Sequence, residues 1–193
     1  MCFFLLIFNI ILFVYFYIFF LFTFFRLTIL FFVLSSLDLL KSLDTINDDK
    51  KKGIIDWIYA QQIPPPDQLS RNTESPKYCG KFGFRASPIN GKNSEHDFAN
   101  LSQTYSALAC LIILGDDLQR LKKSYILEGL STYQQKDGSF IQAFCEHEDD
   151  IRVIYCAISI AFILNDFSTI DVEKTTDFIR NCLVSSHKQK QFF

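Results

Sequence analysis

The sequence predicts an all-α fold in which helix pairs build a double-layered barrel, and this chain holds an incomplete set of those pairs. Helical segments that are apolar on nearly all sides alternate with amphipathic ones, as an inner and an outer ring of helices require. Two pairs end in a similar turn, where glutamines precede a glycine and an aromatic residue, at 60–84 and 133–140. Such repeats bury their apolar faces only against neighbouring repeats, so the pairs must stack side by side.

The first helix pair opens with a strongly apolar segment. We expect one helix over 28–43 and an amphipathic helix over 51–61, with Asn47 or Asp48 as the cap of the second helix. Three consecutive prolines end that helix, because proline removes a helical hydrogen bond. The polar stretch 64–98 then predicts a long ordered loop, a type of segment that often carries function.

The second and third pairs repeat this order. Helices that are apolar nearly all round are expected over 102–114 and 150–164, and amphipathic helices over 122–135 and 171–183. Gly115 is suited to the C-cap of the first of these helices. The third pair lacks the glycine–aromatic turn after its last helix, so we expect the remaining repeats of the barrel to be missing from this sequence.

Composition narrows the classes of partner. The net charge of the 193-residue chain is −2, so neither nucleic acid nor an acidic membrane surface is implied. None of the six cysteines forms a CxxC pair, and several lie inside apolar helical runs. Buried, reduced thiols of a cytoplasmic protein are therefore expected.

Residues 1–25 differ from the rest of the chain. They are apolar or aromatic except for Asn9 and Thr23, and they are long enough to span a bilayer. The basic start and small-residue cleavage site of a signal peptide are missing, as are the glycine and alanine through which membrane helices pack. We expect a gene-model artefact, translated from AT-rich non-coding sequence, with a membrane anchor as the alternative. Residues 184–193 form a divergent tail for which the same origin is considered.

Six segments in order resemble protein prenyltransferase β subunits, and most of all the type I geranylgeranyltransferase β subunit: 26–38, 55–59, 103–108, 114–118, 137–140 and 150–157. The resemblance covers 26–183, which we interpret as a partial α/α-toroid domain. A Rab geranylgeranyltransferase β subunit is the alternative within the family, although the Leu-Gly-Asp-Asp-Leu segment and the long loop favour type I. A non-catalytic, membrane-anchored helical protein is the alternative outside the family.

The resemblance implies an enzyme that transfers geranylgeranyl from its diphosphate to the cysteine of a CaaX tail, as on small GTPases. It implies a helical α subunit as partner, and a zinc ion that lowers the pKa of the substrate thiol. In the family the zinc ligands lie in later repeats. We therefore expect no catalytic residue and no metal ligand in this chain, and no activity from it alone. The loop groups His96-Asp97 and Cys145–His147 are expected not to bind metal.

The resemblance assigns five residues to the isoprenoid site: Thr28, Phe32, Tyr105, Arg152 and Tyr155. Thr28 would lie at the far end of the lipid tunnel, where the farnesyl enzyme has a tryptophan that fills the space of the fourth isoprene unit. The alternative for Thr28 is an ordinary helix-interior threonine, bonded to a preceding carbonyl. The alternative for the two tyrosines is ordinary burial with a hydrogen-bonded hydroxyl.

Four residues are assigned to the peptide site: Asn100, Glu148, Arg152 and Val153. Because Arg152 lies on an apolar inner helix, we expect a buried guanidinium that pairs with Glu148 and helps to organise the site of the peptide's carboxylate. A simple ion pair at the helix cap is the alternative. The family often has a histidine at the position of Asn100. Other members have an aromatic residue at the position of Val153, and the smaller valine would enlarge the pocket for the last residue of the peptide or shift its preference.

Overall fold

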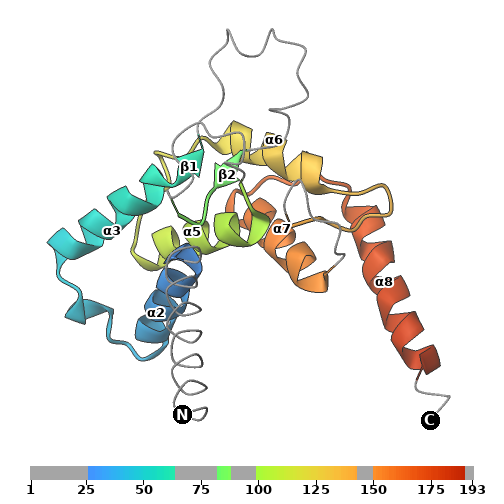
Figure 1. Ribbon diagram of the computed structural model, residues 1–193, viewed down its shortest axis with the longest axis horizontal. Coiled ribbons are helices and arrows are strands. Elements are labelled where there is room, and N and C mark those ends of the chain that lie inside the picture. Colours follow the sequence, from blue (N-terminus) through green and yellow to red (C-terminus); the bar gives the residue numbers. More distant parts are fainter. Residues whose placement is uncertain (1–25, 64–81, 88–98, 143–149, 190–193) are drawn as a thin grey trace, which may run out of the picture.

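The computed structural model describes residues 26–63, 82–87, 99–142 and 150–189 of the chain. Within these ranges the chain forms six α-helices, one short 3-10 helix at Leu43–Thr45 and one two-stranded sheet. The helices lie in two rows that follow an arch (Figure 1). The all-α prediction is therefore confirmed for the described part of the chain.

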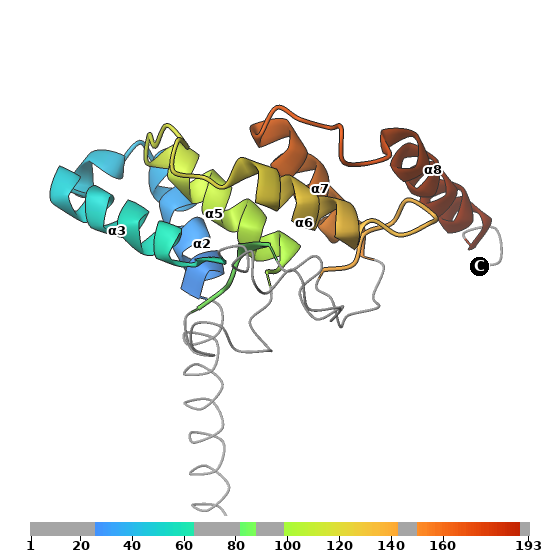
Figure 2. The same cartoon turned by 90° about the horizontal axis from the view of Figure 1, so that it is seen from above.

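The inner row consists of α2 (Arg26–Leu39), α5 (Leu101–Ile113) and α7 (Ile151–Ile163). α5 packs between the other two, although they are distant in sequence. The outer row consists of α3 (Asp48–Ala60), α6 (Lys123–Tyr133) and α8 (Val172–Gln189). Figure 2 shows the same helices from above. The predicted enclosure of the inner helices holds for α5, which buries eight of its residues, but not for α2, which buries only Leu27 and Leu34.

The helix ends follow from local sequence. Asn47 caps α3, because its side chain accepts a hydrogen bond from the amide of Lys50 at 2.9 Å. Asp150 caps α7 in the same way through the amide of Arg152. After α5 and α7 the chain turns through a left-handed residue, Gly115 at φ 79° and Asn165 at φ 49°. The two positions match within the repeat, and both residue types tolerate this conformation.

The glycine–aromatic turns form short antiparallel pairings. β1 (Gln62–Ile63) pairs with β2 (Gly83–Phe84), so that Gln62 lies opposite Phe84. In the next repeat Gln134 pairs with Phe140 in an isolated bridge. The repeated turn was predicted from the sequence, whereas the strand pairing within it was not. Most of the long loop between β1 and β2 lies outside the described residues.

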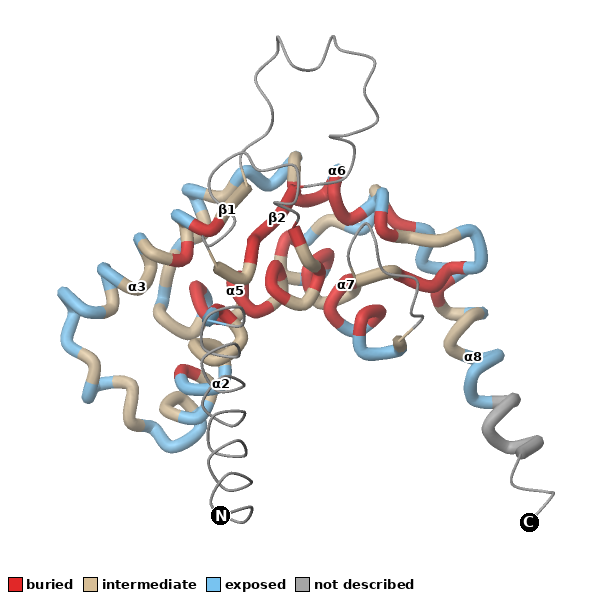
Figure 3. Tube along the Cα trace, in the orientation of Figure 1, coloured by how far each residue is buried: buried red, intermediate tan, exposed pale blue. Residues whose placement is uncertain are grey.

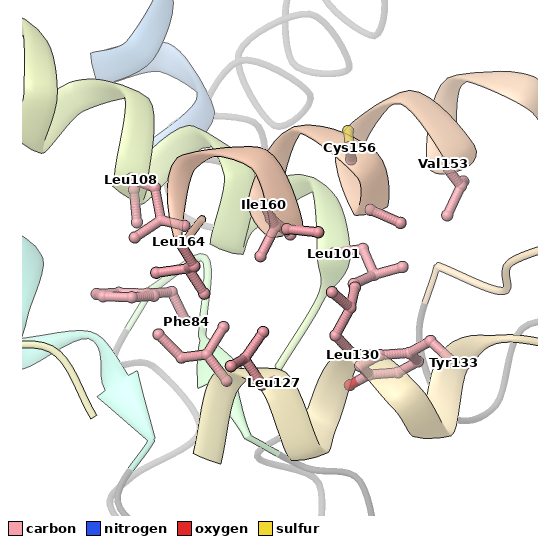
Figure 4. Packing of buried hydrophobic residues seen from close by; sticks show 14 of the residues in the cluster. Phe84, Leu101, Leu108, Leu127, Leu130, Tyr133, Val153, Cys156, Ile160 and Leu164 are labelled. Carbon is pink, nitrogen blue, oxygen red and sulfur yellow. The ribbon is translucent and has the colours of Figure 1, made fainter. Parts of the chain in front are cut away.

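The core lies between the two rows of helices (Figure 3). Figure 4 shows side chains of α5 and α7 meeting those of α6 and β2, among them Leu108, Ile160, Leu130 and Phe84, all of which are buried. The hydroxyl of the buried Tyr133 donates to the carbonyl of Ala99 at 2.8 Å, so this polar group is satisfied inside the apolar core. None of the described helices combines the length and the apolar character that a membrane crossing needs.

Candidate functional site

The inner helices carry apolar side chains on the face that the core does not use. On α7 the buried positions include Ile154 and Ile160, while Tyr155 and Phe162 on the other face are 60% and 75% exposed. Phe32 of α2 is 62% exposed, and Ile112 of α5 is exposed as well. Large apolar side chains grouped on one surface usually mark a binding site. The concave side of the arch is therefore the candidate site.

A row of aromatic rings crosses this surface from helix to helix. Phe31 of α2 meets Tyr105 of α5 edge-on, with ring centroids 5.5 Å apart. Tyr105 in turn meets Tyr155 of α7 at 5.4 Å, and their hydroxyl oxygens lie 3.2 Å apart. Phe31 also contacts Phe32 at 5.6 Å. Three helices thus contribute to one continuous aromatic surface, which we call the aromatic row: Phe31, Phe32, Tyr105 and Tyr155.

Tyr105 of the aromatic row is uncharged at neutral pH. Desolvation raises the pKa of the Tyr105 hydroxyl above its ordinary value, and the hydrogen bond with Tyr155 raises it further. Tyr105 therefore stays protonated well beyond the physiological range. A surface lined by aromatic rings suits a hydrocarbon ligand better than it suits a charged ligand.

Thr28 lies at the junction of α2 and α5. Its hydroxyl accepts a hydrogen bond from Nε2 of Gln103 at 2.8 Å and donates to Oε1 of the same side chain at 3.1 Å. Gln103 is only 4% exposed. The alternative in which the Thr28 hydroxyl bonds a preceding carbonyl is therefore not what the structure shows, since its partner lies 75 residues away.

The expectation of a buried Arg152 is wrong. Its side chain is 88% exposed, because the residue occupies the first turn of α7, where the helix leaves the core. Its guanidinium forms an ion pair with Asp150, the N-cap of the same helix, and Nε donates to Oδ2 of Asp150 at 2.7 Å. That hydrogen bond lowers the pKa of the Asp150 carboxyl. The pair with Asp150 is a cap-region contact, and the expected pairing with Glu148 stays a prediction, because Glu148 lies outside the described residues.

Asn100 caps a helix, and Val153 is buried in the core. The Oδ1 atom of Asn100 accepts hydrogen bonds from the amides of Ser102 at 2.9 Å and Gln103 at 3.3 Å, which makes it the N-cap of α5. Val153 is 2% exposed and belongs to the buried cluster of Figure 4. It lies on the other face of α7 from Tyr155, packed in the core, and its place in a peptide pocket stays a prediction.

The structure offers little for a metal in its described part. No three His, Cys, Asp or Glu side chains gather there in a group that could hold an ion. Cys110 and Cys156 are buried, and burial raises the pKa of Cys110 to about 12, which disfavours the thiolate that binds metal. Cys182 is exposed, contrary to the expectation of burial for the helical cysteines. The predicted non-sites at His96-Asp97 and Cys145–His147 lie outside the described residues.

Two contributors to the site were missed by sequence reasoning. Phe31 was not assigned, although it neighbours the assigned Phe32. Gln103 was not assigned either, although a glutamine within an apolar, enclosed helix signals a polar partner elsewhere in the fold.

Comparison with known proteins now identifies the class. The family described as "Prenyltransferase alpha-alpha toroid domain" matches residues 19–187, so the chain belongs to this family. Among curated relatives, the geranylgeranyl transferase type-1 subunit beta of Dictyostelium discoideum is 35% identical over 171 residues, and that of Arabidopsis thaliana is 32% identical over 160. These matches cover 82% and 81% of this chain but only 47% and 41% of the relatives.

A solved structure supports the same fold. The Candida albicans protein geranylgeranyltransferase-I complexed with GGPP superimposes with a TM-score of 0.66 at 22% identity. The match covers 81% of this chain and 44% of that one. The chain thus corresponds to less than half of a toroid of this kind, with three inner helices in its described part.

Proposed function

We propose that this chain supplies part of the isoprenoid-binding wall of a protein geranylgeranyltransferase type I β subunit. The observation that carries the proposal is the aromatic row, which joins all three inner helices on the face away from the core. The names of the relatives favour type I over the Rab-directed alternative. The complete protein would act in the cytoplasm with an α subunit, on proteins with CaaX tails.

The residues of this chain would hold the lipid and exclude water from it. Tyr105 and Tyr155 present aromatic rings whose hydroxyls are hydrogen-bonded to each other, which suits a branched hydrocarbon chain. Zinc, where the complete enzyme binds it, supplies a substrate thiolate at neutral pH. The described residues do not fit that ion, so no step of the reaction is assigned to a metal held by this chain.

Thr28 would set the length of lipid that the site accepts. Its side chain is small and half-buried beside the aromatic row, so it leaves room that an indole would fill. In the complete enzyme with its α partner, Thr28→Trp should shift preference from geranylgeranyl towards farnesyl diphosphate by steric exclusion. Lost burial of one isoprene unit costs on the order of 2–4 kcal/mol, from about 0.8 kcal/mol per CH2, which is at least about tenfold.

The test compares kcat/KM for the two diphosphates under identical conditions. Leu39→Trp is the matched control, because it adds the same ring at an 81% exposed position of the same helix. The control should leave the ratio unchanged. A folded, active Thr28→Trp enzyme with an unchanged ratio would show that Thr28 does not measure lipid length.

A further inference from the structure

The Thr28–Gln103 pair is a part-buried polar contact between the inner helices α2 and α5. Both hydrogen-bonding groups of the Gln103 carboxamide engage the single hydroxyl of Thr28, at 2.8 and 3.1 Å. Gln103 is only 4% exposed, and it lies two residues before Tyr105 of the aromatic row. Burying an amide in this way is costly unless it is paired, so the sequence must keep both partners together.

The pairing also fixes the direction of the hydroxyl. A threonine side chain carries a methyl group and a hydroxyl on the same carbon, and the two exchange places when the side chain rotates. Because Gln103 holds the hydroxyl against α5, that group is not available to the concave face. The wall at Thr28 therefore presents no unpaired hydroxyl.

We propose that Gln103 is a positioning residue for lipid-length selection, which acts by keeping the Thr28 hydroxyl paired within the helix interface. The role rests on the proposed function, since it presumes that Thr28 faces the end of the isoprenoid. Without Gln103 the hydroxyl turns towards the lipid and brings a water with it. The last isoprene unit of the longer substrate then meets a hydrated wall, whereas the shorter substrate does not reach it.

The experiment is a double-substitution cycle in the complete heterodimer. Gln103→Met keeps the length of the side chain but removes its hydrogen bonds, and Thr28→Val keeps the shape but removes the hydroxyl. We expect Gln103→Met to reduce the preference for geranylgeranyl over farnesyl diphosphate by about tenfold, measured as the ratio of the two kcat/KM values. The double variant, which has no hydroxyl left to pair, should return the ratio to within about twofold of the wild type.

If Gln103→Met does not fold, the comparison of Thr28→Ser with Thr28→Val tests the proposal instead. Serine retains the hydroxyl and its partner, so the wild-type ratio should persist, whereas Thr28→Val should lower the ratio by leaving the carboxamide unpaired. A purely structural clamp would behave differently. Gln103→Met would then lower the melting temperature without moving the ratio, and the double variant would be no better than either single one.

Two further outcomes separate the inference from the function on which it rests. If the wild-type enzyme neither binds nor uses geranylgeranyl diphosphate, the proposed function falls, and the role of Gln103 falls with it. If the wild type prefers the longer lipid and the substitutions leave that preference unchanged, the role of Gln103 alone is overturned.

Discussion

Gly53 and Gly129 lie in the interiors of two outer helices, and the same substitution should have opposite effects on them. A Cβ atom built on Gly53 of α3 meets no other atom within 4 Å. The residue borders an open groove of about 660 Å3 between α2 and α3, with Ile54 and Trp57 among its walls. Gly53→Ala should therefore stabilise the protein by roughly 0.5–1 kcal/mol, the usual difference in helix propensity.

Gly129 of α6 is surrounded closely. A Cβ atom there would lie 2.5 Å from the carbonyl oxygen of Phe82 and 3.4 Å from its Cβ. Because the close atom belongs to the backbone, α6 must move away from the 82–87 segment. Overpacking of this kind costs about 1–3 kcal/mol, which exceeds the gain in helix propensity. Gly129→Ala should accordingly destabilise by about 1–2 kcal/mol.

The assay is urea unfolding of the intact polypeptide, followed by far-ultraviolet circular dichroism, with both variants measured beside the wild type. The difference between the two variants is the decisive quantity, because both replace the same residue type in the same kind of element. We expect a separation of about 2 kcal/mol in the free energy of unfolding. Equal stabilities would contradict the packing of α6 on Phe82, and a destabilised Gly53→Ala variant would show that the groove at Gly53 is filled.

Two further predictions concern side chains on the surface and in the core. Maleimide should label Cys182 in the native protein, while Cys110 and Cys156 should react only after unfolding. Mass spectrometry of protein digests maps the labelled positions. Labelling of Cys110 or Cys156 in the native protein would contradict the packing of the inner row. If the proposed function holds, Arg152→Gln in the complete heterodimer should raise KM for a CaaX peptide by about tenfold with little change for the lipid diphosphate, because an exposed guanidinium beside the concave face suits a carboxylate. Arg180→Gln, on an outer helix, is its control, and an equal effect of both would refute a specific role.

Sequence reasoning succeeded where the determining signals are local. The N-cap at Asn47 and the left-handed turn at Gly115 need only their own neighbours, so the helices and their order could be predicted. α7 could not be oriented in this way, because it is apolar on nearly all sides. Tyr155 and Val153 are two positions apart, about 200° around the helix, and nothing in their hydrophobicity says which one faces the core.

The environment of a residue at a helix end, and contacts between helices, were also not predictable from the sequence. Arg152 was expected to be buried because its helix is apolar, yet the first turn of that helix reaches solvent and supplies Asp150 as a partner. The partner of Gln103 is 75 residues distant, and no pattern within α5 identifies Thr28. Contacts of this type depend on how the repeats stack. Local sequence patterns predict the type of repeat but not which side chains meet between repeats.

The stacking of repeats also explains why a binding surface arises in this fold. An inner helix has the outer row on one side and the inside of the arch on the other, so its sequence must be apolar around most of its circumference. The core uses one face, through residues such as Ile160, and the second face remains available as the aromatic row. Adding further repeats would lengthen this surface without altering the contacts already made. Under the proposed function, a long hydrocarbon ligand would be matched by an array of inner helices, and each repeat would contribute one or two side chains to its wall.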